Sequence, residues 1–153
     1  MPYNREGWGI CVASDSSPDG LGAGDYIVTS DGSSELVRRD PGTLAPWDVI
    51  HVRSEGARVT GLNDLTWAGG IIWANVIGTP MLVGVNPGTG EVTDVVDAHR
   101  ARERHRGNPQ AVMNGLAALP APGEFLLTGK TWRAIRHVRL VPARPRSRTG
   151  LAV

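Results

Sequence analysis

The sequence is poor in several kinds of residue, and each shortage excludes a class of protein. Cys11 is the only cysteine among 153 residues, so no intramolecular disulfide can form and cysteine-rich zinc sites are excluded. Because no run of about 18 apolar residues is present, we expect no membrane-spanning segment. Sixteen Lys and Arg residues against 15 Asp and Glu give a net charge of +1, which argues against a general nucleic-acid binder. The segment 1–6 lacks the basic and apolar regions of a signal peptide, and nothing else in the sequence indicates a compartment.

Glycine and proline, in contrast, are abundant. The 20 Gly and 11 Pro residues make up about a fifth of the chain, against roughly 12% in an average protein. Both residue types weaken helices, so this composition requires many turns. Short β-branched or aromatic runs lie between the turns, namely Tyr26–Thr29, Val49–Val52, Ile71–Trp73, Met81–Val83 and Phe125–Leu127. The chain is therefore predicted to be all-β, and Asp97–Arg106, which has no apolar stripe, is predicted to be a solvated loop.

The predicted strands repeat along the chain. The turn signals Asp40–Thr43 and Asn86–Thr89 stand 46 residues apart, and in that register Tyr26–Asp31 aligns with Ile72–Ile77. A third copy, Phe125–Lys130, follows 53 residues later and leads into Ile135–Leu140. A short strand-like element precedes each copy, at Trp8–Ile10, Asn63–Leu65 and Asn114–Leu116. Each unit therefore contains an inner strand, a middle strand, a third strand that enters a turn, and an outer strand.

Four-stranded units of about 40 to 50 residues are typical of β-propeller blades. Three blades cannot close a ring that needs about four to eight, so we expect the C-terminal part of a larger propeller without its N-terminal blades. The partial propeller is predicted to span residues 1–142, and the basic segment 143–153 is predicted to be a disordered tail. The alternative is a small β-sandwich in which the periodicity is accidental.

The propeller interpretation also predicts where a functional site would lie. Inner strands line the central channel, and the loops at one end of these strands form a pocket. Two sets of equivalent positions are predicted to converge there, Trp8, Asn63 and Asn114 at the start of the inner strand, and Asp31, Ile77 and Lys130 at the end of the next strand. Cys11 falls on an inner strand and is predicted to be a small buried hydrophobic residue.

Five motifs in order resemble those of a known enzyme family. They are Glu6–Ile10, Ser30–Ser33, Leu62–Leu65, Trp73–Val76 and Thr128–Trp132. Together they make the chain similar to the plant-type and bacterial glutaminyl-peptide cyclotransferases, or glutamine cyclotransferases, over about Tyr3–Val141. The resemblance implies a five-bladed propeller that requires no metal or other cofactor. It also implies an aminoacyltransferase that converts the N-terminal glutamine of peptides to pyroglutamate and releases ammonia.

The resemblance assigns roles to individual residues. Lys130, the only lysine of the sequence, and Asn63 match catalytic residues of the family. Trp8 and Asp31 match its substrate-binding motifs, and Ile77 stands where the family usually has another pocket tryptophan. Each residue also has a purely structural interpretation. Trp8 could be a core anchor, Asn63 and Asp31 could serve turns, and Lys130 could be an exposed hairpin residue.

The resemblance also implies that an essential part is missing. The family's general acid/base glutamate lies on blades that this chain is not expected to possess. General acid–base catalysis contributes about 10² to 10⁴ in rate, so the chain is expected to be weakly active or inactive. The alternative function is that of a non-catalytic propeller fragment, a binding module that oligomerises through its exposed blade edges.

Overall fold

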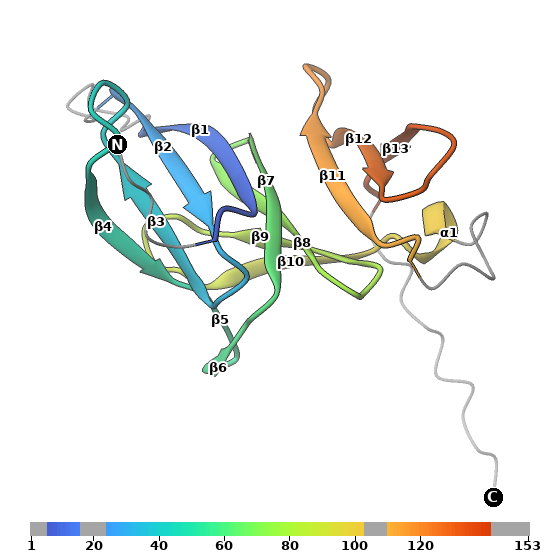
Figure 1. Cartoon of the computed structure of the whole chain (residues 1–153), viewed down its shortest axis with the longest axis horizontal. Coiled ribbons are helices and arrows are strands. Elements are labelled where there is room, and N and C mark those ends of the chain that lie inside the picture. The colour runs from blue at the N-terminus through green and yellow to red at the C-terminus, as the bar shows by residue number, and fades with distance from the viewer. Residues whose placement is uncertain (1–5, 16–23, 103–109, 142–153) are drawn as a thin grey trace, which may run out of the picture.

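The computed structural model describes residues 6–15, 24–102 and 110–141, which form three successive antiparallel sheets (Figure 1). The first sheet consists of β1 (Gly9–Asp15), β2 (Gly24–Ser30), β3 (Glu35–Arg39) and β4 (Pro46–His51). The second consists of β7 (Leu62–Ala68), β8 (Ile71–Val76), β9 (Met81–Val85) and β10 (Val92–Asp97). The third consists of β11 (Met113–Ala118), β12 (Glu124–Gly129) and β13 (Arg136–Arg139).

In each sheet the strands pair in the order in which they follow along the chain. The first strands of the three sheets, β1, β7 and β11, lie next to one another, with β7 in the middle (Figure 1). They are therefore the inner strands, and each sheet is one blade of a propeller. The all-β, partial-propeller prediction is confirmed, and each of the predicted β-branched runs falls largely or wholly within a strand.

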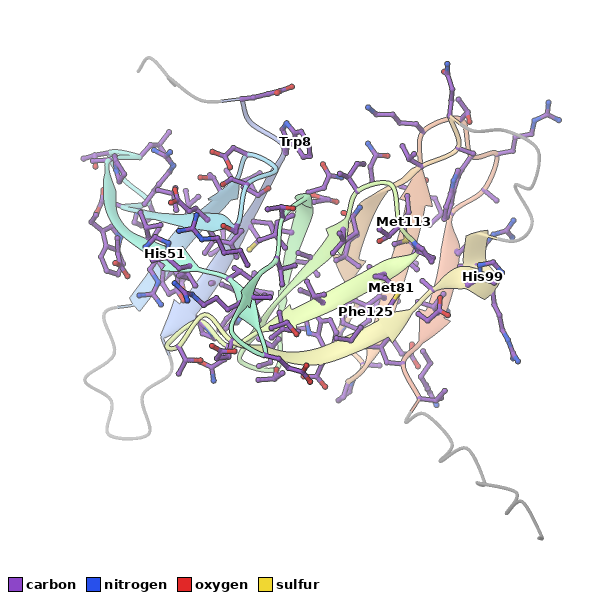
Figure 2. The ribbon with its side chains drawn as sticks, turned by 90° about the horizontal axis from the view of Figure 1, so that it is seen from below. Trp8, His51, Met81, His99, Met113 and Phe125 are labelled. Carbon is purple, nitrogen blue, oxygen red and sulfur yellow. The ribbon has the colours of Figure 1, made fainter. Side chains whose placement is uncertain are left out.

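Each pair of neighbouring blades encloses an apolar cluster. Between the first and second blades the buried side chains include Val28, Leu36, Ile50, Leu62, Ile72 and Val85. Between the second and third blades they are Trp73, Leu82, Met113, Leu116, Phe125 and Leu127. Trp73 and Phe125 meet edge to face, with ring centroids 5.4 Å apart. Figure 2 shows Met113, Phe125 and Met81 in this second region, while Trp8 lies at the margin of the first sheet. The blades are thus separate sheets that share their cores.

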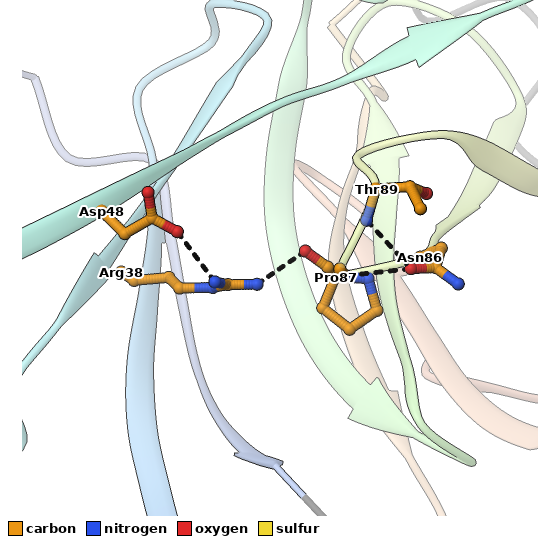
Figure 3. A network of polar contacts seen from close by, with 6 residues as sticks. Arg38, Asp48, Asn86, Pro87 and Thr89 are labelled. Carbon is orange, nitrogen blue, oxygen red and sulfur yellow. Dashed lines mark hydrogen bonds and ion pairs between the residues drawn. The ribbon is translucent and has the colours of Figure 1, made fainter. Parts of the chain in front are cut away.

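A polar contact joins the outer parts of the first and second blades (Figure 3). Arg38, on β3, donates to Asp48 Oδ2 at 2.8 Å and to the carbonyl oxygen of Pro87 at 2.6 Å. Pro87 belongs to the predicted Asn86–Thr89 turn, in which Asn86 Oδ1 accepts hydrogen bonds from the backbone N–H groups of Gly88 and Thr89. One predicted turn of the repeat therefore also serves as a docking point between blades.

The prediction of a loop at Asp97–Arg106 is wrong in part, because a short helix, α1 (His99–Arg102), begins there. Asp97 Oδ1 accepts a hydrogen bond from the backbone N–H of His99 at 2.8 Å, which caps the helix. Ala98 and Ala101 pack against the second apolar cluster. Two alanines and a cap are therefore enough for one helical turn, although the segment lacks the apolar stripe of a longer helix.

Two other features differ from the prediction or lie beyond it. A hairpin of β5 (Arg53–Ser54) and β6 (Ala57–Arg58) connects the first and second blades, and no strand was predicted there. The third blade has three strands in the described part of the chain, whereas four per blade were expected.

The predicted tail 143–153 lies outside the described residues. Among the helices of the described segments, none is long and apolar enough to cross a membrane.

Candidate functional site at the ends of the second strands

The second strand of each blade ends beside the start of its inner strand. Ser30 pairs with Gly9, Val76 with Leu62, and Gly129 with Met113. The residues that directly follow Ser30, Val76 and Gly129 are Asp31, Ile77 and Lys130. These three predicted site residues therefore occupy equivalent positions in successive blades, as the sequence repeat indicated.

Asn63 and Asn114 are also equivalent, but Trp8 is displaced from them. Asn63 and Asn114 follow the paired residues Leu62 and Met113, and each stands where the pairing with the second strand shifts register. Trp8 instead precedes the paired residue Gly9, so it lies two positions earlier than the predicted alignment placed it.

Trp8 nevertheless lies at this end of the blades. Its backbone N–H donates to the carbonyl oxygen of Ser30 at 3.1 Å, and its indole ring covers Gly32. A Cβ atom on Gly32 would come within 2.6 Å of the ring, and the φ of +81° there also favours glycine. Trp8 remains 36% exposed, so part of the residue is accessible to a ligand.

Backbone hydrogen bonds connect this end of the first blade to the second. The N–H of Gly61 donates to the carbonyl oxygen of Gly32 at 2.7 Å, and the N–H of Ile77 donates to that of Gly61 at 2.8 Å. Ser30 Oγ donates to the carbonyl oxygen of Asn63 at 2.5 Å. Through these bonds the structure brings the predicted residues Trp8, Asp31, Asn63 and Ile77 to one shared edge.

Asp31 serves a turn at this edge. Its Oδ1 accepts hydrogen bonds from the backbone N–H of Ser33 at 3.1 Å and from Ser33 Oγ at 2.5 Å. This is an Asx turn, the structural interpretation that the sequence also allowed. Asp31 is half-buried beside Gly32, which places its carboxylate next to the residue that the Trp8 ring covers.

Asn63 is buried and belongs to a polar network between the second and third blades. Its Nδ2 donates to Asn75 Oδ1 at 3.4 Å. Asn75 Oδ1 also accepts from the backbone N–H of Asp64 at 2.9 Å, and Asn75 Nδ2 donates to the carbonyl oxygen of Met113 at 2.7 Å. Since Met113 pairs with Gly129, this network ends one residue from Lys130.

Lys130 is exposed on the third blade. Its backbone N–H donates to the carbonyl oxygen of Val112 at 2.9 Å, and no residue that the structure describes binds its ammonium group. Trp132, two residues later, packs against Gly129 and donates from Nε1 to the carbonyl oxygen of Ala111 at 3.3 Å. Trp132 therefore anchors the loop, and the side chain of Lys130 remains exposed.

Beneath the edge lie two titratable groups with perturbed pKa values. Burial raises the pKa of the Asp64 carboxyl, although the backbone N–H groups of Leu116 and Leu65 donate to it at 2.7 and 3.0 Å. Burial, together with the nearby charge of Asp64, raises the pKa of the Cys11 thiol to about 12. Asp64 thus holds the inner strand of the third blade, and Cys11 packs against the first apolar cluster. Within the described segments no three His, Cys, Asp or Glu side chains are grouped as metal ligands would be.

A groove of about 270 Å³ lies elsewhere, between β4 and the turn of the second blade. Its lining includes Arg38, Asp48, His51 and Pro87. Because Arg38 already donates to both Asp48 and Pro87, the groove reflects the contact between two blades rather than the predicted site.

Asn75, Ser30 and Gly32 also belong to this region, although the sequence motifs alone do not assign a role to them. Asn75 is a fully buried asparagine within an otherwise apolar strand, and such a residue needs hydrogen-bond partners. The motif Trp73–Val76 contains this polar residue among apolar ones, so the need for partners is visible in the sequence. One of these partners, Met113, lies on another blade, and no local sequence pattern indicates it.

Comparison with known proteins identifies the family. The sequence model of glutamine cyclotransferase matches residues 1–140. The chain belongs to the glutamine cyclotransferase family. The glutaminyl-peptide cyclotransferase of Arabidopsis thaliana is 29% identical over 150 residues, which are 95% of this chain and 43% of that protein. The crystal structure of Myxococcus xanthus glutaminyl cyclase is similar with a TM-score of 0.74 and 31% identity, over 92% of this chain and 59% of that one. The chain thus spans about half the length of these members of the family.

Proposed function

We propose that this chain binds peptides with an N-terminal glutamine and cyclises them slowly to pyroglutamyl peptides. The observation that carries the proposal is the shared edge formed by Trp8, Asp31, Asn63 and Ile77, which hydrogen bonds through Ser30, Gly32 and Gly61 hold together. Membership of the family supports it, as does the name of the Arabidopsis relative. No metal or other cofactor has a role in the proposal.

In the proposed reaction the α-amine of the glutamine attacks the carbonyl carbon of its own side-chain amide. A carbon–nitrogen bond forms, the amine gives up a proton, and the side-chain nitrogen leaves as ammonia after taking up a proton. The exposed Trp8 would cover the folded substrate, and the exposed ammonium of Lys130 would stabilise the oxygen that becomes negative. The proton transfers lack an assigned residue in this chain, so we expect the rate to be low.

Mass spectrometry tests this function directly. The purified chain is incubated with a peptide that has an N-terminal glutamine, and the loss of one ammonia above the spontaneous rate is measured. We expect Lys130→Ala to lower the turnover by about 10², the effect of removing one oxyanion donor. Arg133→Ala, which removes another exposed cation three residues away, is the matched control and should retain the activity. Equal turnover in Lys130→Ala and the unaltered chain would contradict the role of Lys130.

A specific observation also favours the second candidate, a binding module that self-associates. One face of the first sheet supplies Val28 and Leu36 to the cluster shared with the second blade, and the opposite face carries Ile10 and Val12. Ile10 is 61% exposed on this face, and Val12 is 58% exposed. Ile10 pairs with Thr29, which pairs with Val37, so these side chains share the face. We propose that a second copy of the chain covers this face.

Light scattering over a wide range of protein concentration tests self-association. We expect the mean mass to rise with concentration, and the double substitution of Ile10 and Val12 by threonine to suppress the rise. A monomer mass at every concentration would contradict this second candidate and would leave the proposed reaction unaffected.

A further inference from the structure

Asn75 has an orientation that its backbone partners determine. It is fully buried in β8, where Oδ1 accepts from the N–H of Asp64 at 2.9 Å and Nδ2 donates to the carbonyl oxygen of Met113 at 2.7 Å. A backbone N–H can only donate and a backbone carbonyl can only accept. The oxygen of the Asn75 amide must therefore face Asp64 and its nitrogen must face Met113, without the ambiguity that usually attends side-chain amides.

This orientation determines that of Asn63 in turn. Asn63 Nδ2 lies 3.4 Å from Asn75 Oδ1, and a reversed Asn63 amide would place two carbonyl oxygens against each other. The oxygen of the Asn63 amide is therefore directed away from Asn75. No residue that the structure describes donates to Asn63 Oδ1, yet this atom is not one of the fully buried atoms without a partner. Asn63 Oδ1 is thus an accessible acceptor, on a residue whose backbone carbonyl is held by Ser30 Oγ.

We propose that Asn75 is a positioning residue that turns Asn63 Oδ1 toward the substrate, where it accepts a hydrogen bond from the α-amino group of the peptide. The inference rests on the proposed function and deepens it. An amine that donates one N–H to Asn63 keeps its lone pair free to attack the side-chain carbonyl. An acceptor oxygen would repel a developing oxyanion, so the same geometry leaves oxyanion stabilisation to a donor such as Lys130.

The orientation can be tested without any substrate. In a protein of 16.3 kDa, the side-chain NH₂ of Asn63 can be followed by nuclear magnetic resonance. We expect its hydrogen exchange to be about tenfold slower than that of an exposed asparagine, and Asn75→Ala to remove this protection. Thr66→Val is the matched control. It removes the acceptor for the N–H of Ala118, another contact between the second and third blades, and should leave Asn63 protected. An unprotected Asn63 amide in the unaltered chain would overturn the inference.

The substrate contact needs a second measurement. Calorimetry compares a peptide that has N-terminal glutamine with the same peptide lacking its α-amino group. We expect the amine to raise the affinity about tenfold in the unaltered chain and in Thr66→Val, the usual effect of one hydrogen bond. In Asn75→Ala and Asn63→Ala the two peptides should bind equally.

The two failures are distinguishable. If the Asn63 amide is protected but neither peptide binds, the proposed function is wrong and the orientation stands. If both peptides bind the unaltered chain with equal affinity, the proposed function survives and the role of Asn63 as acceptor for the amine is wrong. An amine preference that persists in Asn75→Ala would contradict the positioning role of Asn75.

Discussion

Gly9 and Gly32 allow neighbouring groups to approach so closely that no other residue would fit. A Cβ atom on Gly9 would overlap the carbonyl oxygen of Asn63, so the inner strands of the first two blades touch at this point. A Cβ atom on Gly32 would enter the Trp8 ring. The candidate site thus depends on the lack of a side chain at Gly9 and Gly32 as well as on the side chains that are present. The contacts at these two glycines set the distance between Trp8 and Asn63.

Substitution of Gly9 tests this close approach. We expect Gly9→Ala to destabilise the protein by about 1 to 3 kcal/mol, the usual cost of forcing extra atoms into a packed contact. Gly42→Ala is the control, because its Cβ would lie 3.5 Å from Asp40 Oδ1, an ordinary contact. Denaturation in urea measures both changes. Equal stability of the Gly9→Ala variant and the unaltered protein would contradict the contact between β1 and β7.

The reactivity of Cys11 reports on the same region. Because the pKa of the thiol is raised to about 12, the reactive thiolate at pH 8 should be about 10³ times rarer than for an ordinary cysteine. Alkylation should therefore be very slow in the folded protein, accelerate as the pH rises, and become normal in denaturant. Asp64→Asn removes the smaller of the two causes and should speed alkylation modestly. Rapid labelling of the folded chain at pH 8 would show that the thiol is not buried.

The turn that repeats in the first two blades is closed in the same way by two different residues, Asp40 and Asn86. Asp40 Oδ1 accepts from the N–H groups of Gly42 and Thr43 and from Thr43 Oγ1, while Asn86 Oδ1 accepts from Gly88 and Thr89 in the second blade. The hydrogen bonds from Thr43, first from its side chain and then from its backbone, lower the pKa of Asp40. Both residues thus stabilise the turn through an acceptor oxygen.

We expect Asp40→Asn to preserve the folded state at pH 7, because Asn86 fulfils the same role, and Asp40→Ala to lower the thermal midpoint. A carboxyl whose pKa is lowered by folding stabilises the protein above the unfolded pKa, and this contribution is lost as the pH falls through the folded pKa. Asp40→Asn should therefore be less sensitive to acid than the unaltered protein. Thermal unfolding from pH 7 to pH 3 measures this. Identical pH dependence in the two proteins would contradict the turn's dependence on the carboxylate.

The strands were predictable because their signals are local. Runs such as Tyr26–Thr29 and Phe125–Leu127 are bounded by turn residues, and the 46-residue repeat set the order of strands in the first two blades. The helix α1 and the hairpin β5–β6 escaped prediction for physical reasons. The helix relies on packing of Ala101 against the apolar cluster between the second and third blades. The hairpin turn contains Glu55 with a φ of 51°, which its sequence does not signal.

The candidate site forms only where neighbouring blades meet, because the hydrogen bonds that hold it join residues of different blades. The sequence repeat predicted that Asp31, Ile77 and Lys130 are equivalent, since this needs only a register within each blade. It could not predict that Asn75 reaches Met113 or that Ser30 reaches Asn63, because these bonds join residues 38 and 33 positions apart on different blades. The two-position displacement of Trp8 likewise follows from pairing that only the folded sheet reveals.

Whether the first two blades unfold together can be tested at Arg38. Its guanidinium donates to the carbonyl oxygen of Pro87 in the second blade and also lies over the rings of Tyr26 and Trp47 in the first. Arg38→Met keeps the aliphatic stem but removes these contacts, so we expect the free energy of unfolding to fall by about 1.5 to 3 kcal/mol, typical of a hydrogen bond to a charged group. Hydrogen exchange should accelerate in both blades.

Arg39→Met is the matched control for this change. The hydrogen bonds that Arg39 donates to Thr29 and Leu44 lie within its own blade, so their loss should accelerate exchange most strongly in the first blade. If Arg38→Met affected the first blade alone, the blades would unfold independently. The edge that they share would then be an alignment of separate units rather than one preorganised site. Acceleration in both blades would instead show that the two blades open cooperatively, so that a substitution far from Trp8 and Asn63 affects the stability of the edge on which both lie.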